Sequence, residues 1–247
     1  MKYNFHNKTA LVTGAGKGIG RALVKQLVEY GAKTYALSRT KEDLISLKAE
    51  CPSVNVIECD LLDSAATQNA VLSCGPIDFL VNNAAICICQ PFLEIDSDAF
   101  KNIFRINVEA AIQVSQIAVK SMIERKSGGS VVNVSSQASM TGLGNHTVYG
   151  ASKAALDQMT RNMSFELGPH QIRVNAINPT VVNTAMAKVG WSDPKKADPM
   201  KAQIPLGRFA EVKEVVSVIA FLLSDDASMI SGSCIPIDGG ALGSMVL

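Results

Sequence analysis

The sequence predicts an α/β fold: a Rossmann-like, doubly wound parallel sheet of roughly seven strands with helices on both faces, in a single domain over residues 1–247. Three observations lead to this prediction. Short apolar runs alternate with amphipathic helical patterns along nearly the whole chain, which indicates βαβ units. A glycine-rich turn follows the first apolar run. The chain shows no internal repeat or linker, so right-handed crossovers would place the helices on both faces of one sheet.

The elements follow in chain order from their apolar spacing. The run 9–14 (TALVTG) is a strand bounded by glycine, and 21–31 (RALVKQLVEYG) is a helix because its apolar residues recur at helical intervals. By the same criteria, further strands are predicted at 33–39, 55–60, 77–85, 130–136, 173–179 and 234–240. Further helices are predicted at 41–50, 98–126, 148–168 and 211–224.

The segment 180–210 fits neither pattern. It contains three prolines and mixes polar with apolar residues, which argues against a regular element. Long irregular stretches in compact domains are usually functional. We therefore expect an irregular lid over a substrate site.

The composition excludes several classes of protein. With 47% hydrophobic and 18% charged residues the chain is expected to be globular. A formal net charge of +1, with no long basic run, does not indicate a nucleic-acid-binding surface. The sequence has no apolar run long enough to span a membrane, and its first residues lack the apolar region of a signal peptide. These features predict a cytoplasmic protein.

The chain contains six cysteines, which in the cytoplasm are expected to be reduced thiols. Cys87 and Cys89 form a C-x-C pair that could begin a metal site. Zinc needs further ligands at suitable spacing, and His6, His146 and His170 are scattered along the chain. We therefore expect no metal site.

A glycine-rich loop, VTGAGKGIGRAL, joins the first strand to the first helix. Glycines at this turn allow the backbone to approach a pyrophosphate at the helix N-terminus. The alternative is a turn that uses its glycines for packing alone, but the strand–turn–helix context favours a dinucleotide. The residues expected to form this part of the cofactor site are Gly14, Lys17, Gly18, Ile19 and Gly20.

The end of the second strand indicates which dinucleotide binds. An acidic residue there would bind the ribose of NAD, but the sequence has Ser38, Arg39 and Thr40. Arginine and hydroxyl groups suit a 2′-phosphate, Lys17 adds a second charge, and we expect no carboxylate nearby to repel it. The alternative is a solvated surface arginine. We therefore predict NADP(H). Asp60, at the end of the third strand, could accept a hydrogen bond from the adenine amino group. Alternatively, the next helix could be capped by Asp60 or by Asp63.

Tyr149 and Lys153 lie one helical turn apart on the predicted helix 148–168. Two interpretations are open. A surface tyrosine could be covered by the lysine stem, or the lysine charge could lower the tyrosine pKa from its ordinary value of about 10 for proton transfer.

Several motifs together resemble the short-chain dehydrogenase/reductase family over essentially the full chain: TGAGKGIG (13–20), NNAA (82–85), Asn107, Ser136, Tyr149-x-x-x-Lys153, RVNAINPT (173–180) and PIDGG (236–240). The resemblance implies hydride transfer from NADPH to a carbonyl, with Tyr149 as general acid. It implies that Lys153 tunes the tyrosine and holds the nicotinamide ribose, and that Ser136 binds the substrate oxygen. Asn107 is then part of a water-linked proton relay, unless it is a satisfied core amide. Further cofactor contacts are implied for Leu61, Asn83, Ala84, Pro179, Val182 and Thr184.

Short phrases such as LSRT, QPFLE, NPTVV and WSDP are similar to a homotetrameric, NADPH-dependent branch that reduces small sugars and α-dicarbonyls. This similarity implies a substrate pocket that includes Gln137, His146 and Trp191. The alternatives are that Trp191 only anchors packing and that His146 only ends a loop. Two positions depart from the pattern. Ala85 stands near the cofactor where the broad family often has glycine, which is a minor change. The tail 239–247 also differs, and it leaves the substrate range open because a tail can shape the pocket of a neighbouring subunit.

Two other functions remain possible at this level. One is a 3-oxoacyl carrier-protein reductase or a broad aldehyde/ketone reductase of the same family. Lys195, Lys196 and Lys201 could then receive a phosphopantetheine arm, although this segment is equally typical of a solvated loop. The other is a non-catalytic nucleotide-binding scaffold, since fold alone does not imply activity.

Overall fold

A seven-stranded parallel sheet forms the centre of the molecule, as predicted. The structure is a computed structural model and describes residues 3–243. The strand order is β3-β2-β1-β4-β5-β6-β7, and every neighbouring pair is parallel. The strands are β1 Thr9–Thr13, β2 Lys33–Ser38, β3 Asn55–Glu58, β4 Phe79–Asn82, β5 Gly129–Val134, β6 Ile172–Pro179 and β7 Cys234–Ile237. The order reverses between β1 and β4, where open α/β sheets bind their ligands.

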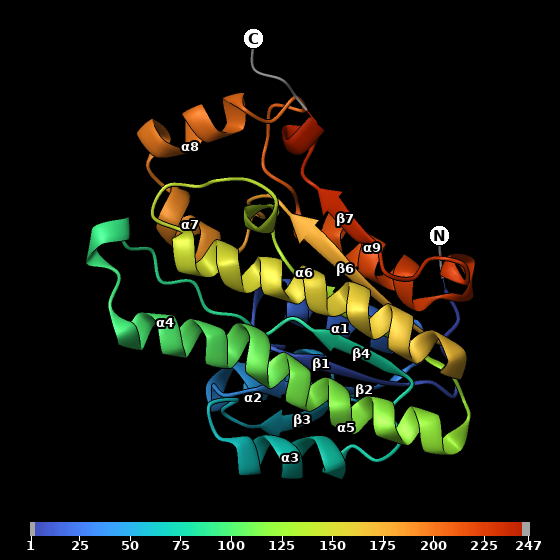
Figure 1. The fold of residues 1–247 in the computed structure, drawn as a ribbon. Helices are drawn as coiled ribbons and strands as arrows, with labels where there is room; N and C mark the ends of the chain where they lie inside the picture. The colour runs from blue at the N-terminus through green and yellow to red at the C-terminus, as the bar shows by residue number, and fades with distance from the viewer. Residues whose placement is uncertain (1–2, 244–247) are drawn as a thin grey trace.

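Helices cover both faces of this sheet (Figure 1). The helices are α1 Gly18–Glu29, α2 Lys41–Glu50, α3 Ser64–Ser73, α4 Ser97–Phe104, α5 Ala110–Arg125, α6 Thr147–Leu167, α7 Ala185–Trp191, α8 Pro194–Ala202 and α9 Val212–Leu223. One apolar core joins one face of the sheet to α1, α2 and α9. The other core joins the opposite face to α3, α5 and α6. The predicted doubly wound architecture is confirmed.

The predicted helix 98–126 is interrupted. Between α4 and α5 the residues Arg105–Glu109 form a π-helical turn, η2, that contains Asn107. A π-turn adds one residue per turn and frequently marks a functional site. An apolar spacing pattern cannot distinguish this insertion from a continuous α-helix, so only the polar Asn107 in an apolar stretch signalled it.

The prediction that 180–210 is irregular was wrong, because this segment contains α7 and α8. Pro194 is the first residue of α8, where its missing amide hydrogen costs nothing. The Asp193 side chain caps the same helix by accepting from the backbone amide of Lys195 at 3.0 Å. Figure 1 shows α7 and α8 standing beyond the carboxyl ends of the strands.

The carboxyl edge of the sheet collects the residues that the sequence singled out. Gly14 follows β1, Asn83 follows β4, Ser136 lies just beyond β5, and Pro179 ends β6. Within residues 3–243, none of the helices combines the length and the apolar character that a bilayer crossing requires.

Candidate active site

The N-terminus of α1 is suited to receive a phosphate. The helix begins at Gly18 after the N-cap residue Lys17, and no side chain caps it. Its first turn carries no acidic residue. The amide groups of Gly18, Ile19 and Gly20 therefore point out of the helix end without a capping side chain, next to the positive end of the helix dipole. This arrangement fits the pyrophosphate of a dinucleotide.

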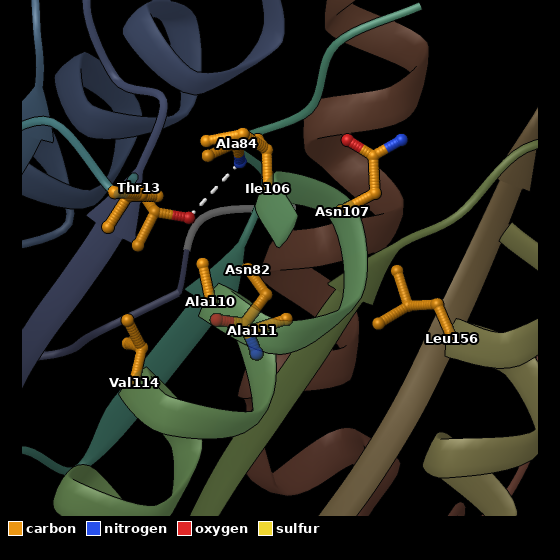
Figure 2. Close-up of a pocket in the computed structure, with 10 residues that line it drawn as sticks. Thr13, Asn82, Ala84, Ile106, Asn107, Ala110, Ala111, Val114 and Leu156 are labelled. Atoms are coloured by element: carbon orange, nitrogen blue, oxygen red, sulfur yellow. Dashed lines mark hydrogen bonds between the residues drawn. The ribbon is translucent and has the colours of Figure 1, made fainter. Parts of the chain in front are cut away.

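Asn83 holds the glycine loop in place from the neighbouring strand. Its Nδ2 donates to the carbonyl oxygens of Thr13 and Gly14, both at 3.0 Å. The backbone amides of Asn83 and Ala84 donate to Thr13 Oγ1, each at 3.1 Å, and the bond from Ala84 is drawn in Figure 2. Gly14 has a φ of +63°, and a Cβ there would lie 2.7 Å from the Ala84 Cα. Glycine is therefore required at position 14.

The expected 2′-phosphate site contains a carboxylate that the sequence analysis did not anticipate. Arg39 is exposed, and its guanidinium has no hydrogen bond or ion pair with any residue in the described range 3–243. Lys17 Nζ, however, lies 3.2 Å from Asp43 Oδ2. A Cβ on Gly16 would contact both Ser38 Oγ and Asp43 Cβ, so these two side chains border the loop. The prediction of no nearby carboxylate was wrong, because α2 turns Asp43 back toward the loop.

The remaining residues expected at the cofactor lie along the same edge. Asp60 is exposed and its Oδ1 accepts from the amide of Leu62, while Asp63 caps α3 by accepting from Ala66. Thr40 precedes α2, and Leu61 is buried.

The segment after β6 lies beside the glycine loop. Val182 forms a β-bridge to Ala210. Thr184 caps α7, and its Cγ2 would lie 3.3 Å from a Cβ on Gly18. The segment after β6 therefore meets the glycine loop.

Tyr149, Lys153 and Ser136 come together at the end of β5. Lys153 Nζ lies 5.7 Å from the centre of the Tyr149 ring. A side-chain hydrogen bond joins Ser136 to Tyr149 and lowers the tyrosine pKa, but burial outweighs it and raises that pKa to about 12. The interpretation of Tyr149 as an exposed ring under a lysine stem does not fit, because Lys153 is 2% exposed. Burial is therefore the dominant influence on the pKa of Tyr149 in this arrangement.

Lys153 is buried within a polar network. Its Nζ donates to the Val134 carbonyl at 2.8 Å. Burial lowers the pKa of Lys153 to about 8, and the nearby carboxylate of Asp157 opposes that shift. Asp157 lies on α6 one further turn along, and its Oδ2 accepts from Asn178 Nδ2 at 2.9 Å. Asp157 was not among the predicted site residues, although its spacing of four residues from Lys153 was a visible signal.

Asn107 joins the π-turn to two other elements. Its Oδ1 accepts from the amide of Ile86 at 2.9 Å. Its Nδ2 donates to the Ile86 carbonyl and to Ser152 Oγ, both at 3.0 Å. The side chain is 1% exposed and fully satisfied. Asn107 therefore fixes the loop after β4 against α6, beside Lys153.

A small cavity lies under the π-turn, between the end of β4 and the start of α5 (Figure 2). Its volume is about 10 Å³, near the minimum for one water molecule and too small for a sugar. Asn82 lines it, and Asn82 Oδ1 has no hydrogen-bond partner in the described part of the chain. This cavity is therefore not the substrate site.

The three residues expected at the substrate occupy different environments. Gln137 is buried, and its Oε1 has no partner among residues 3–243. The His146 ring lies edge-on to Tyr149 with centroids 6.2 Å apart. Trp191 is half-buried in α7 and packs edge-on against Phe209 at 5.8 Å. Gln137 and His146 thus lie next to Ser136 and Tyr149, whereas Trp191 packs within the α7–α8 segment.

His146 also approaches the C-x-C pair. Its Nε2 lies 3.4 Å from Cys89 Sγ, which lies 3.5 Å from Cys87 Sγ. This contact was not predicted, because the histidines are scattered along the sequence. A backbone hydrogen bond from the Gln90 amide to the Asn145 carbonyl, 3.0 Å long, joins the two loops. No sequence pattern reveals a contact between positions 57 residues apart.

Comparisons with known proteins agree with this geometry. Residues 14–241 match the protein family described as enoyl-(acyl carrier protein) reductase. L-xylulose reductase of Bos taurus is 55% identical over 98% of this chain and 99% of its own. Carbonyl reductase [NADPH] 2 of Sus scrofa is 48% identical, covering 99% of this chain and 100% of its own.

A solved structure extends the comparison to three dimensions. The gluconate 5-dehydrogenase of Burkholderia cenocepacia, crystallised with NADP and tartrate, superposes with a TM-score of 0.93 at 25% identity, covering 99% of this chain and 98% of its own. The chain belongs to the short-chain dehydrogenase/reductase family. It is an oxidoreductase, and its relatives identify the cofactor class as a nicotinamide dinucleotide.

Proposed function

We propose that this protein reduces small carbonyl compounds with NADPH, and that L-xylulose, which would give xylitol, and α-dicarbonyls such as diacetyl are substrates. The observation that carries the proposal is the group formed by Ser136, Tyr149 and the buried Lys153 at the carboxyl edge of the sheet. Bound NADPH would supply the hydride. The protein must then hold the carbonyl and deliver one proton to its oxygen.

Tyr149 is the proton donor in this proposal. Because burial raises its pKa to about 12, the phenol carries its proton at neutral pH. Ser136, which already bonds to Tyr149, would bind the same carbonyl oxygen. Lys153 would hold the nicotinamide ribose, and its charge beside the phenol would stabilise the tyrosinate left after proton transfer. Asn107, whose side chain is a satisfied buried amide, would keep the loop and helix around Lys153 in place.

We assign NADP(H) as the preferred cofactor. Support comes from Arg39, which is exposed and free of partners in residues 3–243, and from the hydroxyl groups of Ser38 and Thr40 beside it. Asp43 offsets part of the charge of Lys17. Arg39 therefore carries most of the discrimination. The pig relative is named as an NADPH enzyme, which agrees with this assignment.

The substrate class rests on the relatives together with the polar groups near Tyr149. Bovine, hamster and mouse L-xylulose reductases and a chicken D-erythrulose reductase share 51–55% of their residues with this chain over almost its whole length. Gln137 and His146 beside the centre could bind hydroxyl groups of a short sugar. In this proposal Trp191 closes the pocket from the 180–210 lid.

We also propose a homotetramer in the cytoplasm. Large apolar side chains are exposed on α4, α5 and α6, namely Phe100, Ile112 and Phe165, and burying them between subunits would remove apolar area from water. All six cysteines are free thiols, which suits a reducing compartment. Sedimentation at micromolar concentration tests the tetramer, since a monomer mass would contradict it.

The experiment that tests the function is steady-state oxidation of NADPH and NADH with L-xylulose and diacetyl at neutral pH. Turnover of both carbonyls with a strong preference for NADPH is the expected result. Turnover only of a 3-oxoacyl thioester would replace the substrate assignment and leave the proton donor unchanged. Tight NADPH binding without turnover of any carbonyl would indicate a non-catalytic scaffold and overturn the proposal.

A further inference from the structure

Two loops beside Tyr149 bring three potential metal-binding atoms together. These atoms belong to Cys87, Cys89 and His146. The two Sγ atoms and one ring nitrogen of this group lie within 4.8 Å of one another, and within residues 3–243 it is the single such group of three potential ligands. Both cysteines are exposed, and neither forms a disulfide. The proposed reaction uses neither thiol.

The separations match those of ligands that share one tetrahedral metal ion. With Zn–S of about 2.3 Å and Zn–N of about 2.0–2.1 Å, tetrahedral angles place two sulfur ligands about 3.8 Å apart and a sulfur and a nitrogen about 3.5 Å apart. The observed values are 3.5 Å between the two Sγ atoms and 3.4 Å between Cys89 Sγ and His146 Nε2. Only small side-chain movements separate this group from a coordination sphere.

The histidine ring is already oriented as a ligand. His146 Nδ1 lies 2.6 Å from the Gly144 carbonyl oxygen. A carbonyl can only accept, so Nδ1 carries the hydrogen and Nε2 presents its lone pair toward Cys89. Ligating histidines in proteins are typically held by such a bond from the other ring nitrogen. Asn145, with φ of +63°, makes the turn that precedes His146.

We propose that Cys87, Cys89 and His146 form a binding site for one Zn²⁺ ion, and that the bound ion restricts access to Tyr149. Two thiolates and one imidazole form a three-ligand set that leaves the fourth tetrahedral position open. Soft thiolate ligands favour zinc over magnesium or calcium. Because the His146 ring packs against Tyr149 at 6.2 Å, the ion would join the two loops beside the proton donor. The inhibitory part rests on the proposed function, whereas the binding part does not.

Metal binding at this site is a ligand exchange without electron transfer. Two thiol protons pass to buffer, two Zn–S bonds and one Zn–N bond form, and the ion loses bound water. Because thiol protons are released on binding, zinc affinity should increase with pH.

The first test measures binding directly. Full-length protein, stripped of metal and kept reduced with a phosphine, is dialysed against buffered Zn²⁺ and its metal content is determined. One ion per chain is expected for the unaltered protein and for the control variants Cys234→Ser and His170→Gln. Cys89→Ser and His146→Gln should weaken binding by more than the roughly 10–100-fold that loss of an outer partner costs. Equal metal content in all five proteins, or none in any, would overturn the site.

The second test identifies the ligands and the effect on turnover. Co²⁺ in place of Zn²⁺ should give a thiolate-to-cobalt charge-transfer band that Cys89→Ser weakens. Stoichiometric Zn²⁺ should lower carbonyl reduction in the unaltered protein, while Cys89→Ser keeps its basal activity and loses the sensitivity. Stoichiometric binding with unchanged turnover would overturn the inhibitory part. If the protein reduces no carbonyl at all, the proposed function fails. The metal content and the cobalt spectrum would still show whether Cys87, Cys89 and His146 bind a metal ion.

Discussion

The centre of the site and its rim differ in how their side chains are held. The centre consists of Asn107, Ser136, Tyr149 and Lys153, which lie where β5, α6 and the π-turn meet. Lys153 and Asn107 are almost fully buried, and each is tied to backbone groups of a neighbouring element. The positions of these groups are therefore set by the packing of the whole sheet.

The rim consists of Lys17, Arg39, His146 and Trp191, which stand on loops or on the short helix α7. Arg39 has no partner in residues 3–243, and the Lys17 side chain is 69% exposed even though it pairs with Asp43. Exposed ion pairs contribute little to stability. We infer that the centre determines the chemistry and the rim determines which cofactor and substrate are accepted. Substitutions in the centre should then have much larger effects.

The largest effect is expected for Tyr149→Phe. Removing the phenolic hydroxyl removes the proposed proton donor, so kcat should fall roughly 10²–10⁴-fold, the usual contribution of a general acid. The dissociation constant for NADPH should stay near that of the unaltered protein. Steady-state kinetics and fluorescence titration with NADPH check both values. Tyr3→Phe, in an aromatic cluster with Phe5 and Tyr30, is the matched control. Near-normal turnover by Tyr149→Phe would reject the role of this residue.

The next effect concerns Lys153 and pH. Burial lowers its pKa from 10.5 to about 8 in the folded protein. Between these values the unfolded chain binds a proton that the folded chain has lost, so Lys153 makes the free energy of unfolding rise with pH. Its contribution from pH 8 to pH 10 is about 2 kcal/mol. Buried thiols with raised pKa values, such as Cys74, act in the opposite sense over the same interval, so the Lys153 contribution is seen as a difference between variants. Tyr149 acts in the opposite sense, because its raised pKa contributes stability that is lost as pH rises from 10 toward 12.

Urea denaturation at pH 8 and pH 10 measures this dependence. Lys153→Met should lack the Lys153 contribution, since a buried methionine does not titrate, so the change in its free energy of unfolding from pH 8 to pH 10 should be about 2 kcal/mol less favourable than that of the unaltered protein. Lys120→Met, which removes an exposed lysine on α5, should show the same pH dependence as the unaltered protein. An unchanged pH dependence in Lys153→Met would show that the Lys153 ammonium is not desolvated.

The contrast between centre and rim also explains what the sequence could predict. The strands, the glycine loop, Ser136, Tyr149 and Lys153 were predictable because short-range spacing and parallel topology bring strand ends to one edge. The fold class and the family are confirmed. The same helical spacing also indicates Asp157, one turn beyond Lys153, although this residue was not predicted. The roles assigned to the site residues remain predictions.

The features that escaped prediction depend on long-range contacts or on local geometry. Asp43 returns to Lys17 only because of how α2 packs, and His146 reaches Cys89 only because two distant loops share a hydrogen bond. The π-turn was missed because a π-insertion has no periodic signature. Helix α7, with 7 residues, is too short to show a clear periodicity. Helix α8 was missed because Pro194 in its first turn does not end a helix, and the helix also accommodates Pro199 in its interior. Residues 244–247 of the tail, for which a role in substrate range was left open, lie outside the described residues.

At the rim, Arg39→Asp should change the cofactor preference. A charge-assisted hydrogen bond contributes about 1.5–3 kcal/mol, so kcat/KM with NADPH relative to NADH should fall roughly 10–100-fold. Lys17→Ala should have a smaller effect, because Asp43 already neutralises part of that charge. Kinetics with both cofactors checks the order of the two variants. Unchanged selectivity in Arg39→Asp would show that this arginine does not bind the 2′-phosphate.

The smallest effect is expected at Trp191. Its edge-on contact with Phe209, next to the buried Ala197 and Ile204, holds α7 and α8 together. An aromatic pair of this kind contributes about 0.5–1.5 kcal/mol. If α7 forms a wall of the pocket, Trp191→Ala should raise KM for L-xylulose roughly 2- to 10-fold at nearly constant kcat, while Trp191→Phe keeps the aromatic contact and stays close to the unaltered protein. A fall in kcat without a change in KM would mean that α7 positions the buried centre. Trp191 and α7 would then belong to the centre and not to the rim.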